Sequence, residues 1–151
     1  MFQALEHLLK EVPNAKLVIS GKREQGIDIP NNIQNAIISL GYLPDERMPL
    51  LLNALDVFLV INRDSAFGNF SYPVKLYEAM RCRRPVVASR TKSTSWILKD
   101  YPECLANAND PTDIARRIKN ALSWKTKEYT ASHYEWSHSA SILVDLLENA
   151  S

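Results

Sequence analysis

Short apolar segments rich in valine and isoleucine alternate along the chain with segments whose apolar residues recur at helical spacing. The short segments cover residues 16–20, 36–40, 56–61 and 85–89, with a weaker one at 103–106. Their continuous apolar character is typical of strands buried on both faces of a sheet. The helical segments are marked by Phe2, Leu5, Leu8 and Leu9, by Met48, Leu51, Leu52 and Leu55, by Val74, Leu76, Tyr77 and Met80, and by Ile114, Ile118, Ala121 and Leu122.

This alternation predicts an α/β fold in which a parallel sheet carries helices on both faces. Turn and capping residues fall at the matching boundaries: Pro13-Asn14 after the first helix, Pro44-Asp45 before the second, and Asp110-Pro111 before the helix that ends at Leu122. A last helix is expected over about residues 133–149, packing on or across a single domain of residues 1–151. Its apolar side carries Trp136, Ile142, Leu143, Leu146 and Leu147.

Composition narrows the class of protein. Of the 151 residues, 46% are hydrophobic and 23% charged, which indicates one folded domain. A formal net charge of +1 gives no chain-wide attraction for nucleic acid, so an anion site must be local. No apolar stretch reaches the roughly 18 residues of a membrane span, and we expect no signal peptide. Cys82 and Cys104 fit a reduced, cytosolic setting.

Neither the histidines nor the tryptophans indicate a binding site. The spacing of His7, His133 and His138 is not that of metal ligands, so no metal is expected. The three tryptophans, Trp96, Trp124 and Trp136, are interpreted as packing residues, since no basic residues interleave with them.

The candidate ligand-binding residues are those that follow the predicted strands, because ligands of open parallel sheets bind beyond the carboxyl ends of the strands. The residues that follow the strands are Gly21, Lys22 and Arg23, then Gly41, Tyr42 and Leu43, then residues 62–73, and finally Arg90, Thr91 and Lys92. The stretch 63–73 is long for such a connection, which favours a functional loop. It leads into a helix that begins near Val74, where backbone amides and the Lys75 ammonium are suited to bind phosphate.

Charged residues of this helix have two interpretations. Glu78 either forms an ordinary surface ion pair with Lys75, three residues earlier, or accepts hydrogen bonds from sugar hydroxyls. Arg81, Arg83 and Arg84 lie at the far end of the helix and are interpreted as structural and solvated. Arg90 and Lys92, at the ligand edge, are candidate anion contacts.

Residues 72–89, YPVKLYEAMRCRRPVVAS, resemble the signature of the nucleotide-binding half of GT-B glycosyltransferases. The likeness is greatest to the large retaining family of polysaccharide and glycolipid assembly, family 4 or glycosyl transferases group 1. Flanking segments match in the same order: NAKLVISG, AIISLGYLPDERMPLLLNALDVFLV and LANANDPTDIARRIKNAL. The resemblance implies the Rossmann-like C-terminal half of a GT-B fold. It also implies a UDP- or GDP-linked sugar as donor substrate, with no permanently bound cofactor.

The resemblance also assigns residues. In the family, the glutamate that matches Glu78 holds the ribose, the loop that matches Gly41 to Leu43 lies by the base, and the amides that open the helix meet the diphosphate. Lys75 and Glu78 are the candidates for catalysis, and no metal is implied. The expected donor-binding set is Gly41, Tyr42, Leu43, Ser71, Tyr72, Pro73, Val74, Lys75, Glu78 and Arg90.

Three departures from the family pattern stand out. Phe70 occupies the position of a second carboxylate that contacts the sugar, and Asp64 is a candidate replacement. Arg83 stands where the family usually has a glycine, a position that favours positive φ. The family's first strand, with a Gly-Arg and a lysine that neutralise the diphosphate, is absent. That strand lies between the counterparts of residues 16–20 and 56–61, so either these neighbours pair directly or another chain supplies a strand.

Two functional hypotheses follow. In the first, the chain is the donor domain of a glycosyltransferase that is incomplete and inactive alone. It then needs an N-terminal acceptor-binding half or a partner chain, and works in the cytoplasm, at the inner face of the membrane where the acceptor is lipid-linked. In the second, it is a non-catalytic nucleotide-sugar-binding module, or a regulatory or scaffold module, with the same fold. A receiver-like signalling domain is set aside because its acidic cluster is missing: the first strand ends in Ser20-Gly21.

Overall fold

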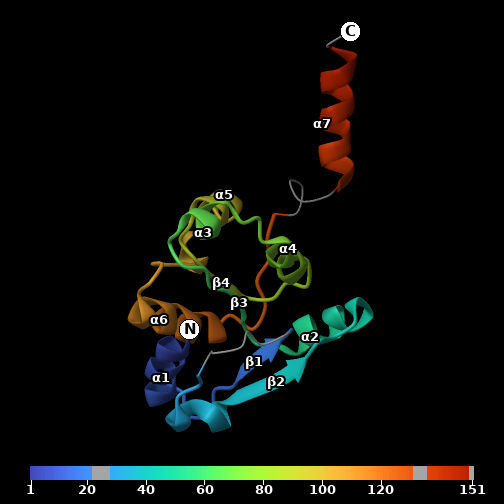
Figure 1. The fold of residues 1–151 in the computed structure, drawn as a ribbon. Helices are drawn as coiled ribbons and strands as arrows, with labels where there is room; N and C mark the ends of the chain where they lie inside the picture. Colours follow the sequence, from blue (N-terminus) through green and yellow to red (C-terminus); the bar gives the residue numbers. More distant parts are fainter. Residues whose placement is uncertain (22–27, 131–135, 150–151) are drawn as a thin grey trace.

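A computed structural model describes residues 1–21, 28–130 and 136–149 (Figure 1). Its helices are α1 (Phe2–Glu11), α2 (Met48–Ala54), α3 (Ala66–Phe70), α4 (Val74–Arg81), α5 (Lys92–Ile97), α6 (Pro111–Leu122) and α7 (Trp136–Glu148). The strands are β1 (Leu17–Ser20), β2 (Ile37–Gly41), β3 (Phe58–Val60), β4 (Val86–Ser89) and β5 (Leu105–Ala106). Short 3-10 helices are η1 (Asn31–Ala36), η2 (Asp45–Arg47) and η3 (Pro102–Cys104). The predicted α/β alternation is confirmed, while α3 and α5 were not predicted.

The strands form two parallel sheets. β1 pairs with β2, and β3, β4 and β5 pair in that order. The sequence left open whether the strands at residues 16–20 and 56–61 pair directly. Within the described residues β1 and β3 do not pair, so that alternative is wrong. The parallel pairing itself is confirmed. Lys22, Arg23 and His133, which the sequence analysis discussed, lie outside the described residues.

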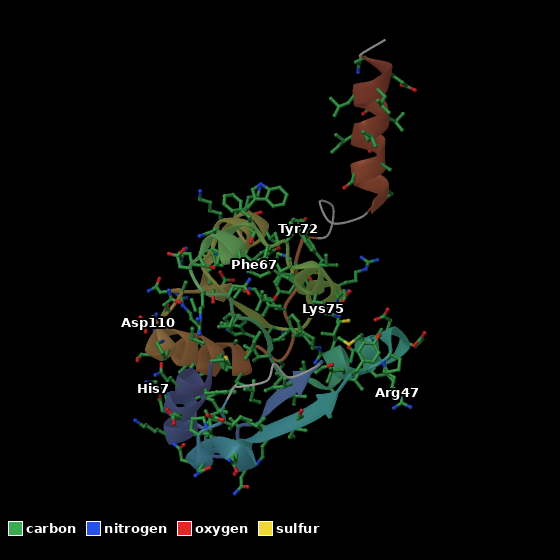
Figure 2. All side chains as sticks on the ribbon, viewed as in Figure 1. His7, Arg47, Phe67, Tyr72, Lys75 and Asp110 are labelled. Carbon is green, nitrogen blue, oxygen red and sulfur yellow. The ribbon has the colours of Figure 1, made fainter. Side chains whose placement is uncertain are left out.

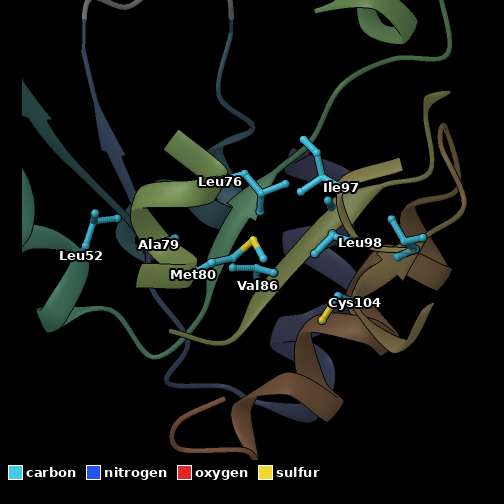
Figure 3. Packing of buried hydrophobic residues seen from close by; sticks show 10 residues of the cluster. Leu52, Leu76, Ala79, Met80, Val86, Ile97, Leu98 and Cys104 are labelled. Atoms are coloured by element: carbon cyan, nitrogen blue, oxygen red, sulfur yellow. The ribbon is translucent and has the colours of Figure 1, made fainter. Parts of the chain in front are cut away.

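Helices cover both faces of the β3-β4-β5 sheet. On one face, α4 and α5 pack on Val86 and Ala88 in a cluster that includes Leu76, Met80 and Ile97 (Figure 3). On the other face, α1 and α6 pack on the remaining side chains of β4 and β5. All four residues of β4 and both of β5 are buried, so burial on both faces is confirmed for these two strands. This sheet and its helices form the core.

The β1-β2 sheet is less covered. Ile38 and Leu40 on β2 are 43% and 40% exposed, and no residue of either strand is fully buried. The expectation that these strands are buried on both faces is wrong. The packing described for this sheet comes from residues of α1 and η1 against Leu17 and Ile37, whereas helices cover both faces of the three-stranded sheet. Helix α1 contacts both sheets: Leu5 packs with Ile33 of η1, and Leu8 packs with α6.

Helix α6 has the start that its sequence predicts. The Asp110 side chain accepts hydrogen bonds from the backbone N–H groups of Thr112 and Asp113, and Pro111 occupies the first turn. Asp113 is itself buried, and its carboxylate accepts a hydrogen bond from the Asn107 backbone N–H at 2.7 Å and another from Arg116. Burial opposes ionisation of Asp113, but these hydrogen bonds outweigh it and lower its pKa. Asp113 therefore stabilises the turn from β5 into α6.

Helix α4 ends in a left-handed residue that is not glycine. Arg83 has φ +55°, its N–H donates to the Met80 carbonyl, and the Arg84 N–H donates to the Ala79 carbonyl, both at 3.0 Å. These two bonds define a Schellman motif, which usually places glycine at this position. The expectation of positive φ at Arg83 is confirmed.

Tryptophan environments differ from one another. Trp124 is half-buried and packs on both faces of the core, as expected. Trp96 on α5 is 67% exposed, so its interpretation as a packing residue is wrong. Helix α7 stands apart from the other elements in Figure 1. Its residues Ile142, Leu143 and Leu146 are exposed. The packing of this helix on or across the domain stays a prediction.

Candidate functional site

Glycines end the first two strands at the expected ligand edge. Gly21 and Gly41 have φ of +109° and +65°, a region that strains any other residue. The Gly21 N–H donates to the Gly41 carbonyl at 2.7 Å, so the loops after β1 and β2 begin side by side. Tyr42, next in the chain, is 74% exposed. These glycines turn both loops sharply at the sheet edge.

Helix α4 begins at Val74, as predicted from the sequence. Its N-cap is Pro73, which gives no side-chain hydrogen bond to the first turn. Two amides of that turn donate instead to backbone carbonyls, Val74 N–H to Tyr72 at 3.0 Å and Leu76 N–H to Pro73 at 2.9 Å. Tyr72, just before it, is held against the helix, because its hydroxyl is 2.5 Å from that of Tyr77 and the two rings stack with centroids 5.5 Å apart. The contact between Tyr72 and Tyr77 thus fixes the direction in which the chain enters α4, whose first turn is the positive end of the helix dipole.

Lys75 and Glu78 lie on one face of α4. The Lys75 Nζ is 3.8 Å from a Glu78 carboxylate oxygen, and the side chains are 57% and 43% exposed. The ordinary ion pair predicted as one alternative is therefore present, but it is long and solvated, and such a pair contributes only about 0.2–0.5 kcal/mol. Both charged groups remain accessible to a ligand.

The same two residues line a cavity between α4 and α2. The cavity has a volume of about 470 Å³, and Asp45, Met48 and Arg81 also line it. In Figure 2, Lys75 lies on the side of α4 that faces α2. The walls combine a cation, a carboxylate and apolar surface, which is the composition of a site for a polar ligand with an apolar part.

Several wall residues were not predicted as site residues. Arg81 was interpreted as solvated, yet it lies one turn after Glu78 and lines the same cavity. The i, i+3, i+6 spacing of Lys75, Glu78 and Arg81 was the signal that could have found it. Of the predicted donor-binding set, only Lys75 and Glu78 line this cavity. The other eight residues do not: Gly41, Tyr42, Leu43, Ser71, Tyr72, Pro73, Val74 and Arg90. The structure therefore brings together only part of the expected site.

The stretch after β3, expected to be a loop, contains helix α3. The Ser65 hydroxyl accepts a hydrogen bond from the Gly68 N–H at 3.1 Å and caps this helix. A Cβ at Gly68 would lie 2.0 Å from the Arg63 carbonyl oxygen, so only glycine fits. Asn69 donates to the Asp64 carboxylate at 2.8 Å and accepts from the Lys92 backbone N–H at 3.0 Å. The segment is thereby tied to the start of α5.

Phe70, at the position of the sugar-contacting carboxylate, and Asp64, its candidate replacement, both contact other side chains of the protein. Asp64, the candidate replacement for the second carboxylate, is exposed and bonded to Asn69. Phe70 is 75% exposed, and the Lys92 ammonium lies 5.3 Å from its ring centroid. The Arg90 N–H donates to the Ala106 carbonyl at 2.7 Å, so its main chain is committed to β5. Arg90 and Lys92 both remain exposed at the ligand edge.

The comparison with known families decides the assignment. The sequence model of the family described as glycosyl transferases group 1 matches residues 1–123. The chain belongs to this glycosyltransferase family. No curated protein matches the chain. The parallel sheets with flanking helices are those of a Rossmann-like GT-B domain, and the family match covers every element from α1 to α6.

Family membership assigns glycosyl transfer in general terms. The α2/α4 cavity described above lies within the matched residues, as do all the predicted donor-binding residues. Helix α7 lies outside the match. Within the described ranges 1–21, 28–130 and 136–149, no helix of this glycosyltransferase domain is both long enough and apolar enough to cross a membrane.

Proposed function

We propose that this glycosyltransferase domain binds a nucleoside-diphosphate sugar, linked to UDP or GDP, beside helix α4. The observation that carries the proposal is the placement of Lys75 and Glu78 on one wall of the 470 Å³ cavity. A nucleoside diphosphate presents two kinds of group, anionic phosphates and ribose hydroxyls. A lysine in the first turn of a helix, at the positive end of the helix dipole, suits the first, and a carboxylate, which only accepts hydrogen bonds, suits the second.

The chemistry divides between these groups. As the bond from the sugar to the diphosphate breaks, negative charge grows on the leaving diphosphate, and the Lys75 ammonium with the α4 amides stabilises it. Glu78 holds the ribose and so fixes the position of the phosphates relative to α4. The Lys75–Glu78 ion pair is loose at 3.8 Å, so a diphosphate competes for the ammonium at little cost. On the base side, we propose that Gly41 to Leu43 contact the nucleobase.

We further propose that the acceptor hydroxyl is presented by an N-terminal half or a partner chain, and that residues 1–151 do not transfer sugar alone. In this proposal transfer retains the anomeric configuration and serves polysaccharide or glycolipid synthesis. The acceptor is lipid-linked, which places the domain in the cytoplasm at the inner face of the membrane.

Calorimetric titration with UDP- and GDP-sugars tests the donor site. Glu78→Ala is expected to weaken binding by about 1–3 kcal/mol, roughly 5- to 150-fold, with little change in melting temperature, because Glu78 is exposed and loosely paired. Glu11→Ala is the matched control, since Glu11 is an exposed glutamate paired with Lys119 away from the cavity. Loss of stability without loss of affinity in Glu78→Ala would show that the pair is only structural.

Phe70 supports the alternative of a non-catalytic module. It replaces the carboxylate that contacts the sugar ring in the family, and its ring is exposed beneath Lys92. A module that has lost sugar recognition binds a nucleoside diphosphate and its sugar conjugate equally well. A donor domain distinguishes the two, so the ratio of their dissociation constants separates the hypotheses.

A further inference from the structure

Helices α3 and α5 carry large aromatic rings on their outer side. Phe67 and Phe70 on α3 are 79% and 75% exposed, and Trp96 on α5 is 67% exposed. The two helices lie side by side (Figure 1), and the Asn69 side chain joins them by accepting a hydrogen bond from the Lys92 backbone N–H at 3.0 Å. Because α3 follows β3 and α5 follows β4, the exposed rings lie at the ligand edge of the three-stranded sheet.

Hydrogen bonds hold both helices in place while their rings stay outside. Thr94 of α5 is fully buried, and its hydroxyl donates to the Ser89 backbone carbonyl. On α3, Gly68 is buried, and its N–H donates to the Ser65 hydroxyl that caps the helix. The positions that face inward are therefore polar or small, and the rings face water. This reverses the usual arrangement of a surface helix, which turns its apolar side to the core.

The three rings and one ammonium form a continuous surface, which we call the aromatic patch: Phe67, Phe70, Trp96 and Lys92. Phe67 and Phe70 are three residues apart on α3, and Lys92 and Trp96 are four apart on α5, so each pair shares a helix face. The Lys92 Nζ lies 5.3 Å from the Phe70 ring centroid and joins the two pairs. At the observed exposure, three rings present on the order of 400 Å² of apolar surface, a size that often marks a binding surface.

Cations outnumber acids around the aromatic patch. Segments 63–70 and 90–100, which carry the patch, contain four exposed cations and two exposed acids: Arg63, Arg90, Lys92 and Lys99 against Asp64 and Asp100. The whole chain has a formal net charge of only +1, so this excess is local. The surface that complements the patch is therefore apolar and anionic at once.

We propose that the aromatic patch docks on the anionic surface of a lipid bilayer, with its rings between headgroups and acyl chains and its cations among the lipid phosphates. Aromatic rings beside lysine and arginine are the composition that binds this interface. Lys92 and Lys99 have apolar stems that can lie along the rings while their ammonium groups reach the phosphates. Docking turns the ligand edge of the domain toward the bilayer. The proposal stands on these contacts and does not depend on the donor site.

Protein occupants fit the aromatic patch less well. A second copy of this chain, placed there by a two-fold axis, would set the same excess of cations against itself. A different protein that covered the rings would also bury the Lys92 ammonium beside Phe70, and would have to supply an acid to pair with it. At a lipid surface the ammonium stays hydrated among anions, so neither cost arises.

Sedimentation of the full chain with vesicles, in the absence of nucleotide, tests the proposal. The vesicles are phosphatidylcholine with about 30% phosphatidylglycerol, and phosphatidylcholine alone is the neutral comparison. We expect binding to the anionic vesicles that is at least about tenfold weaker when Phe67→Ser and Trp96→Ser are combined, and about fivefold weaker for Lys92→Ala. Leu50→Ser and Lys10→Ala are matched controls that should bind normally, since Leu50 is 71% exposed on α2 and Lys10 is exposed on α1.

Fluorescence locates the contact on the protein. The emission of Trp96 should move to shorter wavelength with anionic vesicles, and Trp96→Phe, which keeps a ring, should still bind but lose that shift. Thermal melts that match the unsubstituted chain show that a loss of binding is not a loss of fold.

Several results would overturn the proposal. They are no binding by the unsubstituted chain, equal binding to neutral vesicles, equal binding by the Phe67/Trp96 double variant and Leu50→Ser, or a shift that survives in Trp96→Phe. Self-association without vesicles that the double variant abolishes, measured by light scattering, would identify a second copy as the occupant and refute the assignment to a lipid surface.

Discussion

Replacing Arg83 by glycine is expected to stabilise the domain. Arg83 has φ +55°, and a non-glycine residue in this conformation costs about 1–2 kcal/mol. Glycine removes that cost but loses about 0.5–1 kcal/mol of unfolded-state entropy. The substitution also removes an ion pair in which an Arg83 guanidinium nitrogen lies 3.6 Å from a Glu128 carboxylate oxygen. Both side chains are exposed, so this pair contributes a few tenths of a kcal/mol at most. The net gain in free energy of unfolding is then about 0.5 kcal/mol.

Main-chain contacts at this position survive the change. The Arg83 carbonyl accepts a hydrogen bond from the Lys127 N–H at 3.0 Å, and the Schellman bonds of Arg83 and Arg84 are also made by the backbone. Glycine forms all three. The predicted gain therefore reflects the conformation of one residue and not a rearranged loop.

Urea unfolding followed by tryptophan fluorescence measures the effect. The midpoint of the glycine variant should rise with an unchanged slope, and its melting temperature should rise by about 1–2 °C for a chain of this length. Arg83→Ala is the matched control, because it loses the same ion pair but keeps the Cβ in the strained conformation. If the glycine variant is no more stable than the alanine variant, the argument from backbone conformation is refuted.

Three further predictions concern other parts of the fold. Gly68→Ala should lower the free energy of unfolding by about 1–3 kcal/mol in thermal melts, because its Cβ would meet the Arg63 carbonyl; an unchanged melt would contradict the described loop. The folded-state pKa of Asp113 lies below its unfolded value, so its contribution is present above about pH 4 and is lost as the pH falls further. Asp113→Asn should be less stable at neutral pH and lose less stability on acidification, whereas parallel pH curves would contradict this. Burial raises the pKa of Cys104 to about 11, so a thiol reagent at about pH 8 should label Cys82 in the folded chain and Cys104 only in denaturant, as read by mass spectrometry.

The sequence was sufficient to predict the five strands in order and the start of α4, but not helices α3 and α5. Continuous apolar runs and capping residues are local signals, and Asp110 caps α6 in the structure as its sequence predicts. Helix α3 was missed because its five residues have no apolar period. It is held instead by the Ser65 cap and by the link from Asn69 to Lys92, which joins segments 23 residues apart.

Burial was harder to predict than strand position. β2 and β4 are similar in sequence character, yet β4 is wholly buried and Ile38 of β2 is not. The difference depends on which helices cross each sheet and on where pairing stops, and neither is encoded in the strand itself. Arg81 shows the same limit at the site, since its place on the cavity wall follows from how α2 packs beside α4.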